Sequence, residues 1–355
     1  IFGRTGENIF YLDLDGGILY NMYMVTITDI SKKSGYSVST VSKALNNYSD
    51  VSEKVKDEIQ SLAKSMGYYP SAVARNLKLG NTYNVGVLLY DGVEEKDKLG
   101  LTHCFFAEVL NSFKYQMENH GYDLVFVSDK IGDLESGYLT HCRSKRLDGI
   151  FIICADFNKP IVRELLDYEK PIIAFDYLDP RISTVMSDNG QAISGMLREV
   201  ISRGYENIIF CCDVESLIRN ERVQAATDTC NEYGFKNLYF ENGKYCSMED
   251  GYRIVKETAA KNLKRPCIMF TDDYAALGGL QAVRDLHINV PQDLAIVGFD
   301  GIKVGQMLYP KLTTVQQDSK AIGEAVAQKL LKLMTDSSEK NEKIVIPTKL
   351  LIGDT

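Results

Sequence analysis

The sequence predicts a small all-α head with a helix-turn-helix, followed by an α/β body of two doubly wound parallel-sheet subdomains. Three observations favour this division of the 355 residues. Short segments with helical spacing follow Met24, and apolar runs then alternate with helical segments. The alternation restarts after Asp188. Repeated strand–helix units are typical of parallel sheets covered by helices on both faces.

Three short helices are predicted in the head. Thr26 and Asp29 fit a capping box for the first helix, which should end at Gly35. Ser37 and Ser52 are expected to cap the second and third helices, whose apolar residues recur at helical spacing. Two helices joined by a tight glycine turn form a helix-turn-helix.

Near-continuous apolar runs predict the strands of the body. They are VGVLLY (85–90), YDLVFVSD (122–129), LDGIFIICAD (147–156), PIIAFD (171–176), ENIIFCCD (206–213), NLYFE (237–241), CIMFTDD (267–273) and LAIVGFD (294–300). In open parallel sheets, ligands bind at the carboxyl ends of the strands. Polar and aromatic residues stand at these ends, and we take them as the candidate pocket: Asp91, Ser128, Asp129, Asp156, Phe157, Asp176, Tyr177, Asp272, Asp273 and Asp300.

The chain is divided into four parts by these patterns. They are residues 1–23, expected to be a non-native or misread extension; 24–70, the helix-turn-helix head; 71–83, a hinge segment; and 84–355, the body. Within the body, we expect a first subdomain of residues 84–187 and 316–340, and a second of residues 188–315 and 341–355. The hinge segment has too little apolar surface to form a stable helix alone, so we expect it to fold only when something holds it.

Composition excludes several classes of protein. A hydrophobic content of 45% with 25% charged residues is that of a globular chain. No apolar run is long enough for a membrane span, and the N-terminus lacks the pattern of a signal peptide. Eight cysteines and four histidines are scattered without C-x-x-C spacing, so no metal site is predicted and a cytoplasmic chain with reduced thiols is expected.

Enzymatic motifs are missing from the sequence. No glycine-rich phosphate loop follows the first predicted strand, and no G-x-S-x-G elbow is present. We therefore predict no cofactor and no catalytic activity.

Charge differs between the head and the body. Residues 24–80 carry eight basic and five acidic side chains, a net charge of +3, in a chain whose total is −8. An acidic body with a small basic head is expected when only the head approaches a polyanion.

The segment VTITDISKKSGYSVSTVSKALNNYSDVSEKVKDEIQSLAKSMGYYPSAVARNLKLG resembles the DNA-binding head of the lactose-repressor family of bacterial transcription regulators. Its core extends from Tyr36, where the family usually has Val, to Asn46, and an A-R-x-L motif follows. The resemblance continues through the body to Thr355. It implies a periplasmic-binding-protein-like fold and an effector, most often a sugar, bound between the subdomains.

The resemblance implies DNA contacts on the second helix. It assigns base reading to Val38, Ser39 and Lys43. It assigns phosphate contacts to Thr40, Ser42 and Asn46. A recognition helix enters the major groove with its N-terminal residues against the base edges, whereas phosphate contacts position it. Lys43 stands where Arg is commoner, and it lacks the planar fork of a guanidinium.

Leu77, beside Lys78, matches the family's minor-groove wedge in the hinge segment. An apolar side chain inserted between base steps kinks the duplex. The resemblance implies a homodimer on a pseudo-palindromic operator. A dimer is also expected because no leucine heptads follow the last predicted helix, 319–334.

The resemblance extends to the effector pocket. Asp176, Arg222, Asp272 and Asp300 match effector-binding positions, and Gln317 matches the pocket rim. Asp91 and Phe157 are further candidates because they stand at strand ends. Since the chain has no Trp, any aromatic ring that stacks on the ligand must be Phe or Tyr, and Phe105 and Phe157 are candidates for this contact. Carboxylates with an arginine suit sugar hydroxyls. Two residues depart from the family pattern: Asp272 replaces the usual Asn, and Ala225 replaces Gly.

These observations predict a sequence-specific DNA-binding repressor whose operator affinity is controlled by a small ligand, most often a sugar. Whether the ligand is an inducer or a corepressor stays open. One alternative is a solute-binding protein, which predicts an export signal and no helix-turn-helix. Another is a sugar-processing enzyme with the same body, which predicts turnover of a sugar.

Overall fold

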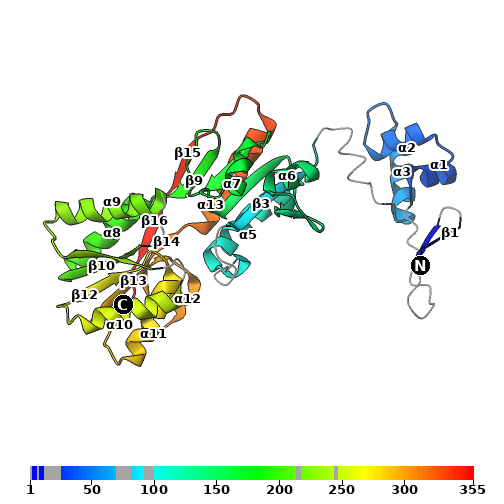
Figure 1. The fold of residues 1–355 in the computed structure, drawn as a ribbon. Helices are drawn as coiled ribbons and strands as arrows, with labels where there is room; N and C mark the ends of the chain where they lie inside the picture. Colours follow the sequence, from blue (N-terminus) through cyan, green and yellow to red (C-terminus); the bar gives the residue numbers. More distant parts are fainter. Residues whose placement is uncertain are drawn as a thin grey trace. The chain divides into compact units, whose positions relative to one another are not determined.

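The computed structural model describes residues 2–5, 8–11, 25–68, 81–91, 100–212, 217–243 and 247–355. The chain forms two compact units, Ile1–Asn81 and Thr82–Thr355 (Figure 1). Near the N-terminus, β1 (Phe2–Thr5) and β2 (Asn8–Tyr11) pair as an antiparallel hairpin.

The first unit contains the three helices expected for the head. They are α1 (Ile27–Ser34), α2 (Val38–Leu45) and α3 (Glu53–Ser65). The capping box is present, since the Thr26 hydroxyl accepts from the Asp29 amide at 3.3 Å and the Asp29 carboxylate accepts from the Thr26 amide at 2.9 Å. Ser37 caps α2 through the Thr40 amide at 3.1 Å, whereas Ser52 forms no side-chain cap on α3.

The helices of the head enclose one small core. Its fully buried residues come from all three helices and include Ile30, Val41, Ala44 and Ile59. Because Val41 and Ala44 face this core, the opposite side of α2 is left toward solvent.

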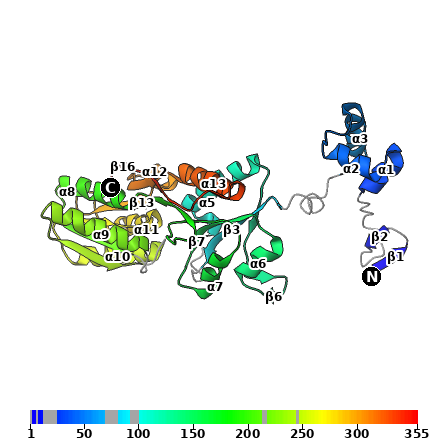
Figure 2. The same cartoon turned by 90° about the horizontal axis from the view of Figure 1, so that it is seen from above.

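The second unit contains two six-stranded sheets, which confirm the predicted doubly wound body. The first sheet is parallel throughout. In spatial order its strands are β15 (Lys343–Ile346), β9 (Ser183–Ser187), β8 (Ile172–Phe175), β7 (Gly149–Ala155), β3 (Asn84–Asp91) and β4 (Asp123–Phe126). Figure 2 shows α5 (Cys104–Asn119) and α13 (Ser319–Thr335) over one face, and α6 (Tyr138–Lys145) and α7 (Pro160–Arg163) under the other.

The second sheet is parallel except for its last strand. In spatial order its strands are β11 (Leu238–Asn242), β10 (Asn207–Cys212), β12 (Pro266–Met269), β13 (Ala295–Asp300), β14 (Thr313–Gln317) and β16 (Thr348–Leu351), which is antiparallel to β14. One face is covered by α8 (Asn189–Ser202) and α9 (Leu217–Glu232). The other is covered by α10 (Met248–Ala260) and α11 (Asp273–Asp285).

Short elements complete the body. They are η2 (Gly100–Thr102), β5 (Lys130–Ile131), β6 (Leu134–Glu135), η3 (Glu164–Asp167) and α12 (Lys303–Met307). In the first subdomain, η2 precedes α5, and β5 and β6 follow β4. In the second subdomain, α12 follows β13.

The C-terminal strands divide differently from the expectation that residues 341–355 belong to the second subdomain. β15 pairs in parallel with β9 of the first sheet, and only β16 joins the second sheet. The expected boundary at residue 316 falls inside β14, which lies wholly in the second sheet. The sequence IVIPTKLL has the same alternation on both sides of Pro347, so its periodicity cannot assign the two strands to different sheets.

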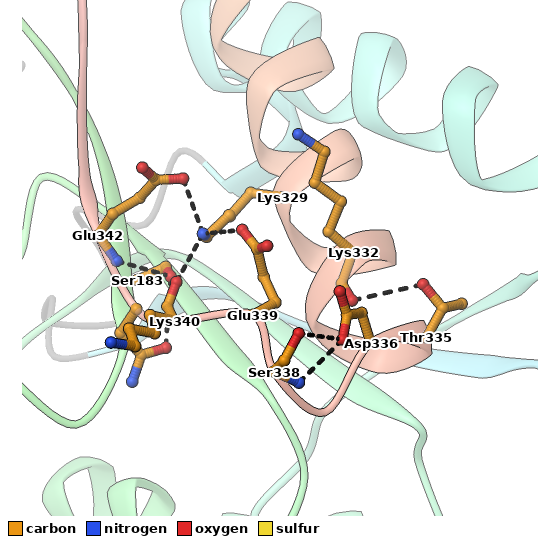
Figure 3. Close-up of polar contacts among 10 residues, drawn as sticks. Ser183, Lys329, Lys332, Thr335, Asp336, Ser338, Glu339, Lys340 and Glu342 are labelled. Carbon is orange, nitrogen blue, oxygen red and sulfur yellow. Dashed lines mark hydrogen bonds and ion pairs between the residues drawn. The ribbon is translucent and has the colours of Figure 1, made fainter.

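A buried lysine holds the loop that leads from α13 to β15 (Figure 3). The Lys329 ammonium lies 2.6 Å from Glu339 and 2.7 Å from Glu342, and it donates to the Lys340 carbonyl at 2.6 Å. Its side chain is only 3% exposed. Removing one partner of a buried ion pair is costly, so this cluster fixes the path of the chain as it returns to the first sheet.

Two glycines bring α10 and α11 into unusually close contact. A Cβ atom at Gly251 would lie 1.9 Å from the Ala275 carbonyl oxygen, and one at Gly278 would lie 2.0 Å from that of Met248. Both distances are to backbone atoms, which cannot move without separating the helices.

We therefore expect Gly251→Ala or Gly278→Ala to lower the free energy of unfolding by about 1–3 kcal/mol, the usual cost of overpacking. Denaturant unfolding of the purified chain measures this change. Gly195→Ala is the matched control, because no heavy atom other than its chain neighbours and the nearby backbone of α8 lies within 4 Å of its Cβ position. Equal stability of the Gly251 and Gly195 variants would contradict the close contact.

Candidate functional site

The solvent side of α2 carries the residues expected to read DNA. Val38 is 47% exposed and Ser39 is also exposed, both in the first turn of the helix. The Thr40 hydroxyl lies 2.9 Å from that of Ser37, so it belongs to the N-cap. Ser42 is half-buried one turn further along the helix.

Two of the expected contact residues already have partners inside the head. The Lys43 ammonium forms an ion pair with the carboxylate of Asp50, in the loop before α3. The Asn46 side chain donates to the Ser42 carbonyl at 2.7 Å. Contacts of Lys43 or Asn46 with DNA would therefore replace existing interactions.

Three predicted site residues fall outside the description. Leu77 and Lys78 lie outside the described residues, and so does the side chain of Asp91, whose backbone ends β3.

Buried polar side chains gather where the two sheets present their carboxyl ends. Asp300 ends β13 and Gln317 ends β14. The Gln317 amide donates to Asp300 at 2.7 Å, and its carbonyl accepts from the Ser187 hydroxyl, at the end of β9, at 2.5 Å. Gln317 therefore connects a strand of the first sheet with a strand of the second.

Arg222 of α9 supplies a buried cation to this group, with only 8% of the residue exposed. Its Nε donates to Asn189 at 2.7 Å, and a terminal nitrogen donates to the Thr271 carbonyl at 3.0 Å. The guanidinium carbon lies 3.8 Å from the centroid of the Phe299 ring, a cation–π contact. These contacts hold the guanidinium in one orientation.

Two carboxylates in the group retain buried oxygens without a hydrogen-bond partner among the described residues, Asp176 Oδ1 and Asp300 Oδ2. Burial raises the pKa of Asp176 to about 7, while Arg222 opposes the rise. The pKa of Asp300 is also well above its ordinary value, because of burial and of the neighbouring charges of Asp273 and Asp272. We call Asp176, Arg222, Asp300 and Gln317 the cleft cluster.

The same two aspartates have strained backbones. Asp176 has φ 57° and Asp300 has φ 115°, in a region where residues with a Cβ are uncommon. Such conformations persist where the surrounding structure enforces them, and they gather at ligand sites.

Two acidic neighbours have structural partners. The Asp272 carboxylate accepts from the Ala275 amide at 2.7 Å and caps α11. Asp273, also among the strand-end residues of the candidate pocket, accepts from the Thr314 hydroxyl at 2.6 Å and the Ile302 amide at 2.8 Å. Asp273 is fully buried, and burial raises its pKa to about 7.

Phe105 and Phe157, the two aromatic residues predicted for the pocket, lie in hydrophobic cores on opposite faces of the first sheet. Phe105 is 3% exposed, and its ring centroid lies 5.7 Å from that of Phe175. Phe157 is stacked on Tyr177 with centroids 3.4 Å apart. Core packing is the contact that the structure shows for both rings.

Ser187 and Asn189 contact the cleft cluster but were missed by sequence reasoning. Both lie at the junction of β9 and α8, where the chain passes from the first sheet to the second. They reach the cluster only because the chain crosses between the sheets at this point. The sequence Ser-Asp-Asn predicts a helix cap but does not predict such a crossing.

Within the described ranges, no helix has the length and apolarity needed to cross a membrane. The same ranges contain no group of three or more His, Cys, Asp or Glu side chains arranged to hold a metal ion.

Two family models match the chain. Residues 26–71 match bacterial regulatory proteins of the lacI family, and residues 197–355 match the periplasmic binding protein-like domain. The HTH-type transcriptional repressor PurR of Edwardsiella ictaluri is 26% identical over 338 residues, which are 92% of this chain and 96% of that protein.

Solved structures share the fold. The lac repressor dimer bound to operator and the anti-inducer ONPF superposes with a TM-score of 0.80 at 19% identity, over 94% of this chain and 99% of that one. The complex of the regulator CelR with cellobiose has a TM-score of 0.63 at 20% identity, over 93% and 99% of the two chains.

The first match contains α1 to α3, and the second contains the strands that end at Asp300 and Gln317. PurR matches both regions over nearly its whole length. The chain thus combines a DNA-binding head of the lacI family of bacterial regulatory proteins with a periplasmic binding protein-like body.

Proposed function

We propose that this chain is a repressor that binds a pseudo-palindromic operator as a homodimer and is controlled by a neutral sugar bound at the cleft cluster. The observation that supports a ligand at this site is the pair of buried, unpartnered carboxylate oxygens of Asp176 and Asp300. The matching relative named above is a repressor, and we propose no enzymatic activity.

The head reads DNA through the solvent side of α2. Val38 and Ser39 stand in its first exposed turn, which is the part of a recognition helix that reaches base edges. Lys43 is the third base-reading residue in this proposal. Phosphate contacts are assigned to Thr40, Ser42 and Asn46. Leu77, with Lys78 beside it, is assigned to the minor groove by its resemblance to the family's wedge.

The chemistry of the cleft cluster favours a donor-rich, uncharged ligand. A buried acceptor without a donor costs free energy that a ligand hydroxyl can recover. Arg222 supplies donors for the hydroxyl or ring oxygens of the same molecule. A phosphorylated sugar would place a second negative charge beside these carboxylates. Asp91, Asp272, Phe105 and Phe157 remain proposed neighbours of this ligand.

An exposed apolar surface supports the homodimer. Its residues surround the end of α12: Val304 (44% exposed), Met307 (80%), Leu308 (42%) and Tyr309 (96%). Large exposed apolar patches mark sites of protein association. Two copies that share this surface would carry two heads, as a pseudo-palindrome requires.

Replacing the exposed residues of α2 should change sequence preference. The probe is a duplex selected from a random pool by the full-length chain. Val38→Ala or Ser39→Ala should weaken binding to this duplex by about 1–3 kcal/mol for each base contact that the variant removes. Fluorescence anisotropy measures this loss. Ser65→Ala, on the exposed surface of α3, is the control. Unchanged affinity and base preference in both α2 variants would remove α2 from the interface.

A thermal-shift screen should identify the ligand class. Neutral mono- and disaccharides should raise the melting temperature, since a ligand at a hundredfold excess over its Kd stabilises by about 2.7 kcal/mol. Arg222→Ala should abolish the shift, whereas Arg265→Ala, which removes a guanidinium stacked on Tyr205 at 5.4 Å, should preserve it. A response confined to sugar phosphates or purines would contradict the neutral sugar.

Ligand affinity should also depend on pH. Asp176 is protonated below its pKa of about 7, so its ionised carboxylate, the better acceptor of ligand hydroxyls, forms as the pH rises. Affinity for the sugar found in the screen should therefore increase from pH 6 to pH 8, by at most about tenfold per pH unit. Titration calorimetry measures this change, and Asp176→Asn should flatten it. An equal slope in Asp176→Asn would assign the dependence elsewhere.

Tyr309→Asp should separate the homodimer, because it places a charge at the most exposed residue of this apolar surface. Sedimentation should then show a monomer, and affinity for the selected duplex should fall by about a hundredfold or more, since the two heads are no longer linked. Tyr233→Asp is the control at another exposed tyrosine, 51% exposed beyond α9. A dimeric Tyr309→Asp chain would exclude this surface as the interface.

A further inference from the structure

The ion pair between Lys43 and Asp50 lies on the surface of the head next to α2. Their side chains are 44% and 53% exposed. The hydrogen bond from Lys43 holds the pKa of Asp50 below its usual value. The carboxylate is therefore ionised at neutral pH, and it neutralises the charge that α2 offers at this position.

The loop between α2 and α3 fixes Asp50 in this place. The Tyr48 amide donates to the Lys43 carbonyl at 3.0 Å, which folds the loop back over the end of α2. Gln60 of α3 donates to the Asn47 side chain at 2.8 Å. The residue after Asp50, Val51, is buried in the core of the head. Asp50 is thus held between two anchored points.

We propose that Asp50 is a specificity-determining residue, which competes with DNA for the Lys43 ammonium and lowers affinity for non-specific sequences more than for the operator. This inference rests on the proposed role of Lys43 in base reading. The operator would release Lys43 by offering base acceptors at short range, whereas other sequences would leave it paired with Asp50.

The strengths of the competing interactions support this role. Non-specific binding comes almost entirely from the neutralisation of phosphates by basic side chains, so a paired lysine contributes little to it. An exposed ion pair is worth only about 0–1 kcal/mol, and the edge of a correct base can therefore displace it. Since residues 24–80, the head together with the hinge segment, have a net charge of only +3, one paired lysine is a large share of their attraction to DNA.

Asp50→Asn in the full-length chain tests the proposal. Two duplexes serve as probes, one selected from a random pool by the unmodified chain and one of mixed sequence. The variant should bind the mixed-sequence duplex about three- to tenfold more tightly, with a salt slope steeper by up to about 0.9. It should bind the selected duplex with a smaller gain, so that the ratio of the two affinities falls at least about threefold.

Glu53→Gln is the matched control. It makes the same change of charge three residues along the chain, but its carboxylate pairs with Lys56 at 2.7 Å instead of Lys43. This variant should leave the affinity ratio unchanged. In a Lys43→Gln background, Asp50→Asn should no longer alter the ratio, because the side chain for which Asp50 competes is absent.

Three outcomes would overturn the inference. Equal effects of Glu53→Gln and Asp50→Asn would show a general effect of charge. Weaker binding of both duplexes by Asp50→Asn, with an unchanged melting temperature, would show that Asp50 orients Lys43 for binding. If Asp50→Asn still changed the ratio of the two affinities in the Lys43→Gln background, the effect of Asp50 would not depend on Lys43. If the unmodified chain selects no duplex, the proposed function itself fails, and the inference fails with it.

Discussion

The buried guanidinium of Arg222 is the interaction on which the arrangement of the body's charged groups depends. Burial raises the pKa of both Asp176 and Asp300, and Arg222 opposes this rise without abolishing it. Two of its five N–H donors are occupied by Asn189 and by the Thr271 carbonyl, which leaves others for a ligand. A cation buried to this extent is tolerated because it has hydrogen bonds and an aromatic face. The group therefore keeps a fixed geometry while two carboxylate oxygens stay available.

Chain crossings place this group where a ligand can act on both sheets. The described chain passes between the sheets three times, after β9, after β14 and between β15 and β16. Ser187 and Asn189 flank the first crossing, and Gln317 precedes the second. A ligand that bonds to Asp176 on one side and Asp300 on the other would favour one relation of the subdomains, which is what control by differential affinity requires.

The sequence predicted what depends on local periodicity and failed where the outcome depends on tertiary pairing. The capping box of Thr26 and Asp29 was sufficient for the start of the head, and the apolar runs were sufficient for most strands. The polar strand β9 and the division of β15 from β16 were not predictable, because a strand's partner is not encoded in its own alternation. The structure adds that Asp272, a predicted ligand contact, caps α11 through the Ala275 amide.

Strain and unmet hydrogen bonding coincide in the body at Asp176 and Asp300. Each has a positive φ, and each has one buried oxygen without a described partner. Glycine would relieve the backbone strain at either position, because it has no Cβ, yet both features are present here. Both can persist where anchored neighbours, Val185 accepting from the Asp176 amide at 3.0 Å and Gln317 donating to Asp300, prevent relaxation. A ligand can supply the donors that these oxygens lack. Hydrogen bonds from a ligand to Asp176 and Asp300 would therefore contribute the most to its binding free energy.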